Sequence, residues 1–251
     1  MIPKKIHYCW FGGKPLDKLG KKCLKSWKKY FPEYEIIEWN ESNVDLESCP
    51  YVKQAYEAKK WAFVSDYVRF KVLYEQGGVY FDTDVEVIKP FDDILAKGAF
   101  LGCENPASAE GEECKISVAS GLGMAAEAGN AFYREVLDDY ESSDFINQDG
   151  TLNLYTVVDR VTDLLKKHGL CDTIQVQQVA GITVYPAEYF CPINMNTGKL
   201  EITDNTHSIH RYAASWVPAK DRFRGKVYFL LVKLFGLKFA QKVQKIVGRK
   251  Q

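Results

Sequence analysis

Two aspartates separated by a single residue, Asp82 and Asp84, are the side chains of this 251-residue chain best placed to do chemistry. They follow the apolar run VYF, so we expect them at the end of a strand, where residues two apart point to the same side. Two carboxylates this close repel one another unless a cation lies beside them. Mg²⁺ and Mn²⁺ prefer oxygen ligands and commonly link protein carboxylates to substrate phosphates. The pair therefore predicts a divalent metal site that binds a diphosphate, although an isolated Asp-x-Asp pair also arises by chance.

The elements around the acid pair follow an α/β order. The predicted strands cover residues 5–10, 35–39, 79–88, 100–103, 117–124 and 182–185. The predicted helices cover residues 16–30, 61–76, 130–140 and 151–168. The opening order of strand, helix and strand indicates a sheet that begins parallel, as in nucleotide-binding α/β folds.

The composition is that of a soluble globular protein. Hydrophobic residues make up 46% and charged residues 26% of the chain, which excludes wholesale disorder, and the length suits one α/β domain. The seven cysteines include no Cys-x-x-Cys pair, so neither a zinc knuckle nor a redox pair is expected. The opening MIPKKIHYCWFGG has no apolar stretch long enough for a signal peptide. Together with the thiols, this predicts a cytoplasmic protein.

Three blocks of sequence together resemble one protein family. The blocks are IPKKIHYCWFGG; Ser65-Asp66-x-x-Arg69 with Leu73-Tyr74, Gly77-Gly78-Val79-Tyr80 and Asp82-x-Asp84; and His207-Ser-Ile-His210-Arg-Tyr-Ala-Ala-Ser215-Trp216. In this order, from about residue 2 to 218, they resemble the glycosyltransferases with the DXD sugar-binding motif. That family includes bacterial capsular-polysaccharide transferases and yeast α-mannosyltransferases, and it is related to the glucosylating clostridial toxins.

The resemblance implies a GT-A fold, which is a Rossmann-like, nucleotide-binding mixed sheet flanked by helices. It also implies an enzyme that moves a sugar from a nucleotide-sugar, with a UDP-sugar as the first candidate, and retains the configuration of the anomeric carbon. The acceptor would be a lipid-linked saccharide of capsular or cell-surface polysaccharide synthesis, and the cofactor Mn²⁺ or Mg²⁺. Glu86 is the nearby carboxylate that could act as a nucleophile, but a front-face route is the favoured interpretation.

The resemblance assigns the metal site to four candidate residues. Asp84 would bind the metal and the diphosphate, and Asp82 would face the ribose and the metal. His210 would be a further metal ligand, because imidazole suits Mn²⁺-like ions, although His207 could serve instead.

The remaining candidates would bind the donor. Asp66 and Arg69 share a helix face and would contact the donor's sugar and ribose, with Arg69 stabilising charge on the diphosphate; the alternative is a surface ion pair. Trp10 would stack on the donor base, or else belong to the core. Asp149 is predicted to cap the helix that follows it. Further donor-binding candidates are Gln148, Ser215 and Trp216.

Residues 220–251 differ in charge from the rest. They contain ten basic residues and one acidic residue, which leaves residues 1–219 with 23 basic and 32 acidic residues. Their longest apolar run, Val227 to Val232, is far shorter than the roughly 20 residues that span a bilayer. The pattern predicts a basic amphipathic helix, either on an anionic membrane or packed on the acidic body. We therefore expect a GT-A catalytic domain, 1–219, and a tail, 220–251, that holds the protein at the inner face of the plasma membrane.

Two other interpretations compete with sugar transfer. VYFDTDVE also resembles the first motif of haloacid dehalogenase-like phosphatases, but Glu86 stands where those enzymes have Thr or Val, and no convincing Gly-Asp-x-x-x-Asp cluster follows. The chain could instead be a non-catalytic, membrane-associated sugar-binding module, which the intact acid pair argues against. Nucleic-acid binding is not expected, because the acidic body would repel a phosphate backbone.

Overall fold

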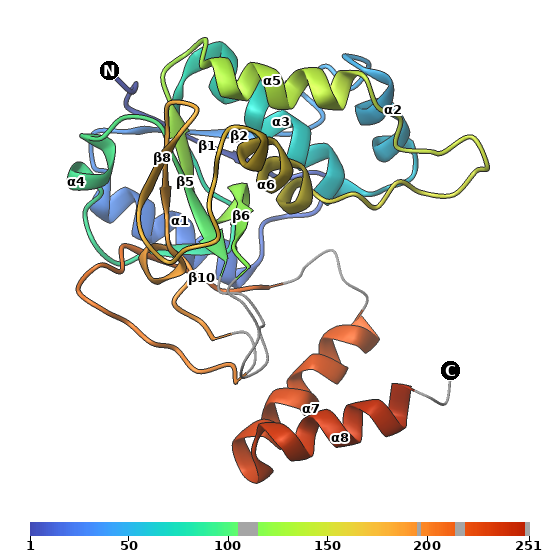
Figure 1. The fold of residues 1–251 in the computed structure, drawn as a ribbon. Helices are drawn as coiled ribbons and strands as arrows, with labels where there is room; N and C mark the ends of the chain where they lie inside the picture. Colours follow the sequence, from blue (N-terminus) through green and yellow to red (C-terminus); the bar gives the residue numbers. More distant parts are fainter. Residues whose placement is uncertain (105–114, 195–196, 214–218, 249–251) are drawn as a thin grey trace.

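A mixed β-sheet with helices on both faces forms the centre of the computed structural model, which describes residues 1–104, 115–194, 197–213 and 219–248 (Figure 1). The strand order is β2 (Glu35–Trp39), β1 (Lys5–Cys9), β3 (Gly78–Tyr80), β7 (Met124–Ala126), β5 (Phe100–Glu104), β9 (Ile182–Tyr185) and β8 (Gln177–Val179), and β6 (Ser117–Ala119) pairs with β5. β1 is parallel to β2 and β3, β5 is parallel to β9, and β7 runs antiparallel between β3 and β5. The carboxyl ends of β1, β3, β5 and β9 therefore share one edge, the carboxyl edge, where α/β sheets bind ligands.

Helices cover the two faces of the sheet unequally. One face carries α1 (Lys18–Tyr30) and α4 (Asp92–Leu95), and the other carries α2 (Pro50–Glu57), α3 (Trp61–Gln76), α5 (Ala131–Glu141) and α6 (Val157–Lys167). Under α1, Trp27 is fully buried and donates its indole N–H to the Val85 carbonyl at 2.8 Å. Under α3, the Phe70 ring packs edge-on against Tyr133 of α5. The predicted mixed α/β architecture is confirmed.

The single strand predicted over residues 79–88 is wrong. β3 ends at Tyr80, and the chain turns at Thr83 and Asp84 before β4 (Val85–Val87) begins. β4 pairs with β10 (Ser208–His210) in a separate two-stranded sheet. The Asp82 carbonyl accepts a hydrogen bond from the Val85 N–H at 3.0 Å, which closes a β-turn. The two acids therefore lie in a tight turn between two sheets.

Two further expectations differ from the structure. Residues 117–124 are not one strand, because a 3₁₀ turn at Ser120–Leu122, followed by Gly123 with φ of +138°, separates β6 from β7. α6 begins later than predicted, because Thr156 and Asp159 form a capping box. Asp149 does not cap that helix; its carboxylate accepts a hydrogen bond from the Thr151 N–H at 2.9 Å.

The tail forms two helices, α7 (Ala219–Phe235) and α8 (Leu237–Gly248), where one was predicted. Gly236, with φ of +83°, separates them, and they fold back on one another as the orange and red hairpin of Figure 1. In the part of the chain that the structure describes, no helix has the length and apolar character needed to cross a membrane. The division of the chain into domains at residues 219 and 220 stays a prediction.

Candidate metal centre

Asp82 is fixed from the interior by a buried arginine. Arg69 of α3 is 4% exposed, and its Nη2 lies 3.2 Å from Oδ1 of Asp82. The Tyr80 hydroxyl donates to the same oxygen at 2.9 Å, and the Arg69 guanidinium lies over the Tyr80 ring at 5.0 Å from its centroid. Both polar contacts use Oδ1, and the Asp82 side chain is 28% exposed. Oδ2 is therefore left to meet a ligand.

Asp66 and Arg69 form a buried ion pair rather than a surface one. Their atoms Oδ1 and Nη2 are 2.9 Å apart, and Nη1 of Arg69 donates to the Ser120 hydroxyl at 3.1 Å. Burial raises the pKa of Asp66 to about 6, although Arg69 opposes this. Burial also disfavours the charge on Arg69, but the neighbouring acids, Asp82 foremost, raise its pKa overall. Arg69 thus stays charged and joins two carboxylates beneath the carboxyl edge.

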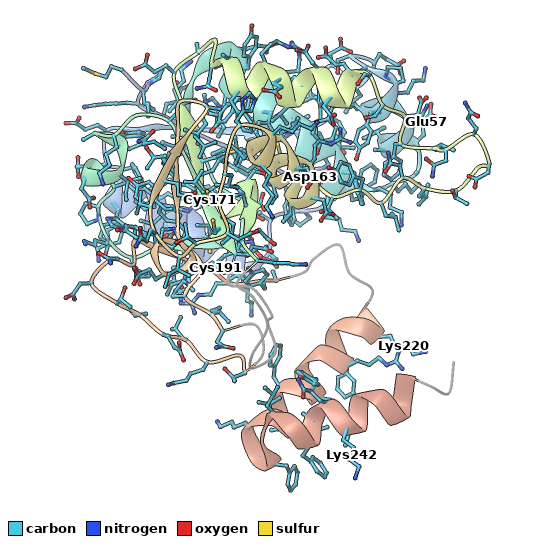
Figure 2. The ribbon with its side chains drawn as sticks, in the orientation of Figure 1. Glu57, Asp163, Cys171, Cys191, Lys220 and Lys242 are labelled. Carbon is cyan, nitrogen blue, oxygen red and sulfur yellow. The ribbon has the colours of Figure 1, made fainter. Side chains whose placement is uncertain are left out.

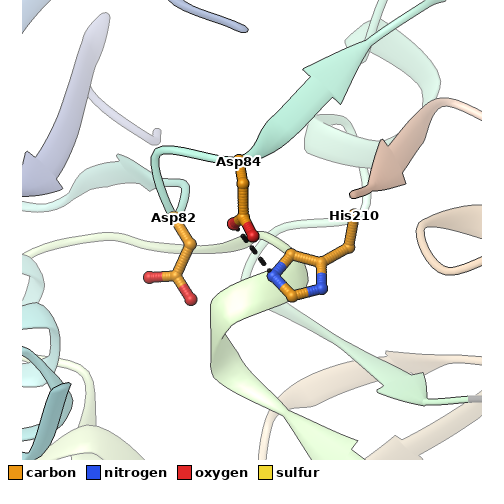
Figure 3. A group of neighbouring side chains, drawn as sticks. All are labelled: Asp82, Asp84 and His210. Carbon is orange, nitrogen blue, oxygen red and sulfur yellow. Dashed lines mark ion pairs between the residues drawn. The ribbon is translucent and has the colours of Figure 1, made fainter. Parts of the chain in front are cut away.

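Asp84 and His210 are brought together by the small sheet, in which His210 of β10 stands opposite Val85 of β4. Oδ1 of Asp84 lies 3.1 Å from Nε2 of His210 (Figure 3). Oδ2 of Asp84 accepts a hydrogen bond from the Ala213 N–H at 2.8 Å. Burial disfavours the charge on Asp84, but His210 and the Ala213 N–H outweigh it and lower the pKa of Asp84. Burial likewise opposes the charged form of His210, but the Asp84 carboxylate outweighs it and raises the pKa of His210.

The residues present fit a divalent metal ion. Asp82, Asp84 and His210 offer one ligand atom each, and these atoms lie within 4.8 Å of one another. In Figure 3 the two carboxylates and the imidazole face a common space. Two carboxylates with an imidazole suit Mn²⁺, and the carboxylates also suit Mg²⁺, with substrate oxygens completing the shell. This is the arrangement that the sequence predicted for these three residues.

His207, the alternative metal ligand, has both ring nitrogens engaged elsewhere. Nδ1 lies 2.7 Å from the Asn205 carbonyl, and Nε2 lies 2.9 Å from the Asp93 carboxylate. The ring stacks on Tyr189, and the side chain is 1% exposed. The geometry therefore favours His210 as the histidine of the site.

The predicted donor-binding residues are placed unequally. Trp10 follows β1 at the carboxyl edge, half-buried, with its indole N–H on the Lys14 carbonyl at 2.5 Å; its stacking role stays a prediction. Gln148 is exposed in the loop between α5 and α6, which projects beside α2, away from β10 (Figure 1). Its donor-binding role stays a prediction. Ser215 and Trp216 lie outside the described residues.

The sequence analysis missed the segment that supports Asp82 from the opposite side. The Asp82 N–H donates to the Gly121 carbonyl at 3.2 Å, and a Cβ placed on Gly121 would overlap the Asp82 carboxylate. Ser120 beside it holds Arg69. The signal was present in the sequence as Ser120-Gly121-Leu122-Gly123, where two glycines interrupt an apolar run.

Two residues that the sequence analysis did not single out, Tyr212 and Glu104, lie beside His210. The Tyr212 ring meets the His210 ring edge-on, with centroids 4.2 Å apart, and the Tyr212 hydroxyl donates to Glu104 at 3.4 Å. Burial raises the pKa of Glu104, although His210 and Tyr212 oppose this. Because Glu104 and Tyr212 are far apart in sequence, only the fold shows that they meet.

The region that contains the acid pair matches a known protein family. Residues 17–101 match the family described as "Glycosyltransferase sugar-binding region containing DXD motif". The match includes Asp66, Arg69, Asp82 and Asp84. Residues 17–101 of the chain are thus a DXD-type glycosyltransferase sugar-binding region. The family favours sugar transfer from a nucleotide-sugar over the phosphatase and binding-module interpretations.

Two known proteins resemble the chain over part of its length. "Subversion of eukaryotic traffic protein A" of Legionella pneumophila is 27% identical in an alignment of length 129 that covers 40% of this chain and 20% of that protein. The chain thus spans about a fifth of the length of this relative. The solved structure named "PaToxG Glycosyltransferase" has a TM-score of 0.50 and 21% identity, over 66% of this chain and 69% of that one. This second likeness concerns the fold, which is of the GT-A type as predicted.

Proposed function

We propose that the glycosyltransferase transfers a sugar, with retention at the anomeric carbon, from a UDP-sugar to a saccharide acceptor and requires Mn²⁺ or Mg²⁺. The observation that carries the proposal is the cluster of Asp82, Asp84 and His210. A metal bound there would hold the donor's diphosphate and offset the charge of the departing nucleotide. Without a cation, the two carboxylates would repel the diphosphate. Donor binding should therefore depend on the metal.

Residues of the chain itself hold the site in its working geometry. Arg69 keeps the Asp82 carboxylate in one orientation through the 3.2 Å contact between Nη2 and Oδ1. The Ala213 N–H fixes Asp84 in the same way. Because these contacts exist before the donor arrives, little reorganisation is needed when the sugar is transferred.

Glu86, the carboxylate that the sequence offered as a nucleophile, is engaged elsewhere. Its Oε2 accepts hydrogen bonds from Arg211 at 2.5 and 2.8 Å, and its Oε1 lies 2.8 Å from Nζ of Lys22. These contacts support a front-face route without a covalent intermediate. The bond from the anomeric carbon to the diphosphate oxygen breaks while a bond to the acceptor oxygen forms on the same face. The acceptor's proton passes to the departing diphosphate oxygen.

Nucleotide release from a panel of UDP- and GDP-sugars, with Mn²⁺, Mg²⁺ or EDTA, tests this proposal. We expect slow release from one donor that stops in EDTA. Asp84→Asn should lower the rate about 100-fold, since it removes a charged group on which the transition state depends. The matched control is Asp204→Asn, which changes an exposed carboxylate and should retain the wild-type rate. Equal release with and without EDTA, or a wild-type rate for Asp84→Asn, would contradict metal-dependent transfer.

We further propose that the tail hairpin holds the enzyme on the cytoplasmic face of an anionic membrane. There the acceptor would be a lipid-linked saccharide of capsular or cell-surface polysaccharide synthesis. The tail carries ten basic residues, among them Lys220 and Lys242 on its two helices (Figure 2). Its large exposed apolar side chains are Phe223, Val227, Phe229, Leu230, Leu234, Phe235 and Phe239. Such a surface gains from apolar burial and, by roughly 1 kcal/mol per basic group, from anionic lipids.

Sedimentation with lipid vesicles tests the membrane proposal. We expect binding to phosphatidylserine-containing vesicles but not to phosphatidylcholine alone, with binding weakened by salt. Phe235→Ser with Phe239→Ser should weaken binding, whereas Ile174→Ser, which changes a 74% exposed side chain on the body, should not. Binding that survives removal of residues 220–251 would contradict the proposal.

A protein of a eukaryotic cell is the second candidate acceptor. The observation that favours it is the similarity to "Subversion of eukaryotic traffic protein A". Incubation with a radiolabelled donor and either a glycolipid extract or a eukaryotic protein extract distinguishes the two. Label in the lipid fraction supports the first acceptor class, and label on a protein band supports the second.

A further inference from the structure

A cavity of about 360 Å³ lies at the carboxyl edge of the sheet. Its lining includes Glu104 at the end of β5 and Pro186, which follows β9. β5 is the second strand beyond β3 in the sheet, and strands are spaced about 4.8 Å apart, so the β5 side of the cavity lies about 10 Å across the sheet from β3, which leads into the acid turn. Its volume is within the range of small-molecule sites. The cavity is therefore placed and sized to hold a second substrate beside a bound donor.

Glu104 connects this cavity to the metal centre. Its carboxylate lines the cavity and accepts a hydrogen bond from the Tyr212 hydroxyl at 3.4 Å, and that hydroxyl also lies 2.9 Å from Sγ of Cys191. The Tyr212 ring packs edge-on against His210. Tyr212 itself has φ of +47°, a strained conformation that non-glycine residues adopt where the surroundings impose it. A group bound against Glu104 would thus lie next to the ligands of the metal.

The lining has the chemistry of a site for an uncharged, hydroxyl-rich molecule. It includes Glu104, Glu188 and Glu201, and none of its described residues is Lys, Arg or His. The Glu188 carboxylate also accepts hydrogen bonds from Thr203 and Asn205, and Glu201 pairs with Lys199 at 3.6 Å. Carboxylates accept hydrogen bonds from sugar hydroxyls and repel anionic groups. Apolar surface from Ile174 and Pro186 offers contact for the C–H face of a pyranose ring.

We propose that this cavity binds the acceptor as an uncharged saccharide, and that Glu104 orients it by accepting a hydrogen bond from one of its hydroxyls. The inference rests on the proposed transferase function and names the acceptor side of the same site. A second hydroxyl of the acceptor attacks the anomeric carbon and gives its proton to the departing diphosphate oxygen. Glu104 takes no proton in this step; it restricts the acceptor to the orientation in which attack occurs.

Transfer from the donor found in the nucleotide-release assay to methyl hexosides and to the matching hexuronides tests the proposal. We expect kcat/KM for at least one hexoside to exceed that for its hexuronide at least tenfold. Glu104→Gln should lower the ratio of transfer to donor hydrolysis at least tenfold. The control is Glu57→Gln, which removes the same charge from α2, far from the Cys191 end of the cavity in Figure 2, and should keep that ratio.

A second variant tests the cavity independently of Glu104. Thr173→Trp places an indole in the lining and should lower the same ratio. Because transfer and hydrolysis are measured in one sample, a partly unfolded variant leaves their ratio unaffected. Three outcomes would overturn the acceptor proposal but not the transferase function. They are a transfer-to-hydrolysis ratio within twofold of wild type in both variants, a preference for hexuronides, and hydrolysis of the donor with no transfer to any hexoside. A wild-type protein that neither binds nor hydrolyses any nucleotide-sugar in calorimetry and release assays would overturn both.

Discussion

Replacing Arg69 by Met should destabilise the protein in a pH-dependent manner, because Asp66 would lose its partner in the interior. With Arg69 present, burial raises the pKa of Asp66 to about 6, so the carboxylate is ionised at pH 7.5. Without Arg69, Asp66 would stay protonated at that pH. Each pH unit above 6 then lowers the unfolding free energy of the variant, relative to wild type, by about 1.36 kcal/mol. At pH 7.5 the difference is about 2 kcal/mol. At pH 5.5 Asp66 is protonated in both proteins, so this cost approaches zero.

Urea unfolding followed by tryptophan fluorescence at pH 7.5 and pH 5.5 measures this difference. The unfolding free energies of Arg69→Met and wild type should differ by about 2 kcal/mol more at the higher pH. In an Asp66→Asn background, where residue 66 cannot ionise, the effect of Arg69→Met should be the same at both pH values. Asp82 adds little, because its side chain is 28% exposed and can meet water. An equal Arg69→Met deficit at both pH values with Asp66 intact would refute the reasoning.

Three further predictions concern residues that support the site or the fold around it. Gly121→Ala should lower the transfer rate at least tenfold and the unfolding free energy by about 1–3 kcal/mol, because the new Cβ would displace the Asp82 carboxylate. A wild-type transfer rate would contradict this prediction. Burial lowers the pKa of His7 to about 4, so an NMR titration should find its ring neutral down to about that pH. The unfolding free energy should fall by up to about 3 kcal/mol as the pH drops from 6.5 to 4. An NMR midpoint near 6.5 would refute this. Thr156→Ala should cost about 1 kcal/mol in urea unfolding by removing the cap of α6, and an unchanged midpoint would count against the capping box.

The sequence predicted those elements whose boundaries are set by local chemistry. The helix predicted over residues 61–76 is α3 without change, because Gly77, with φ of +64°, ends it and donates its N–H to the Leu73 carbonyl. β2 also has the predicted bounds. In the site, Asp82, Asp84 and His210 meet as predicted. The spacing of two aspartates and the late histidine block were enough to nominate them.

The errors have tertiary causes. The runs before and after Asp82 have the same strand-like composition, so nothing local shows that Val85 pairs with His210 in another sheet. The surface ion pair that was the alternative for Asp66 and Arg69 is buried, and a helix face shared by two charges does not reveal what covers it. Gly236, by contrast, is a helix-breaking residue that the sequence shows directly, and it indicates two helices in the tail rather than the one predicted.

The metal site is built from residues of two separate sheets, and this determines when during folding it can form. The hydrogen bond from the Ala213 N–H to the Asp84 carboxylate joins residues 129 positions apart, and β10 is the last strand along the described chain. During synthesis the large sheet can assemble before His210 has emerged, so Asp82 can contact Arg69 while one of the three metal ligands is still missing. Closing so long a loop carries a large entropic cost, which metal binding would offset. The bound metal would then stabilise the pairing of β4 with β10. When the metal is removed, amide hydrogen exchange should become faster in β10 before it does so in the large sheet.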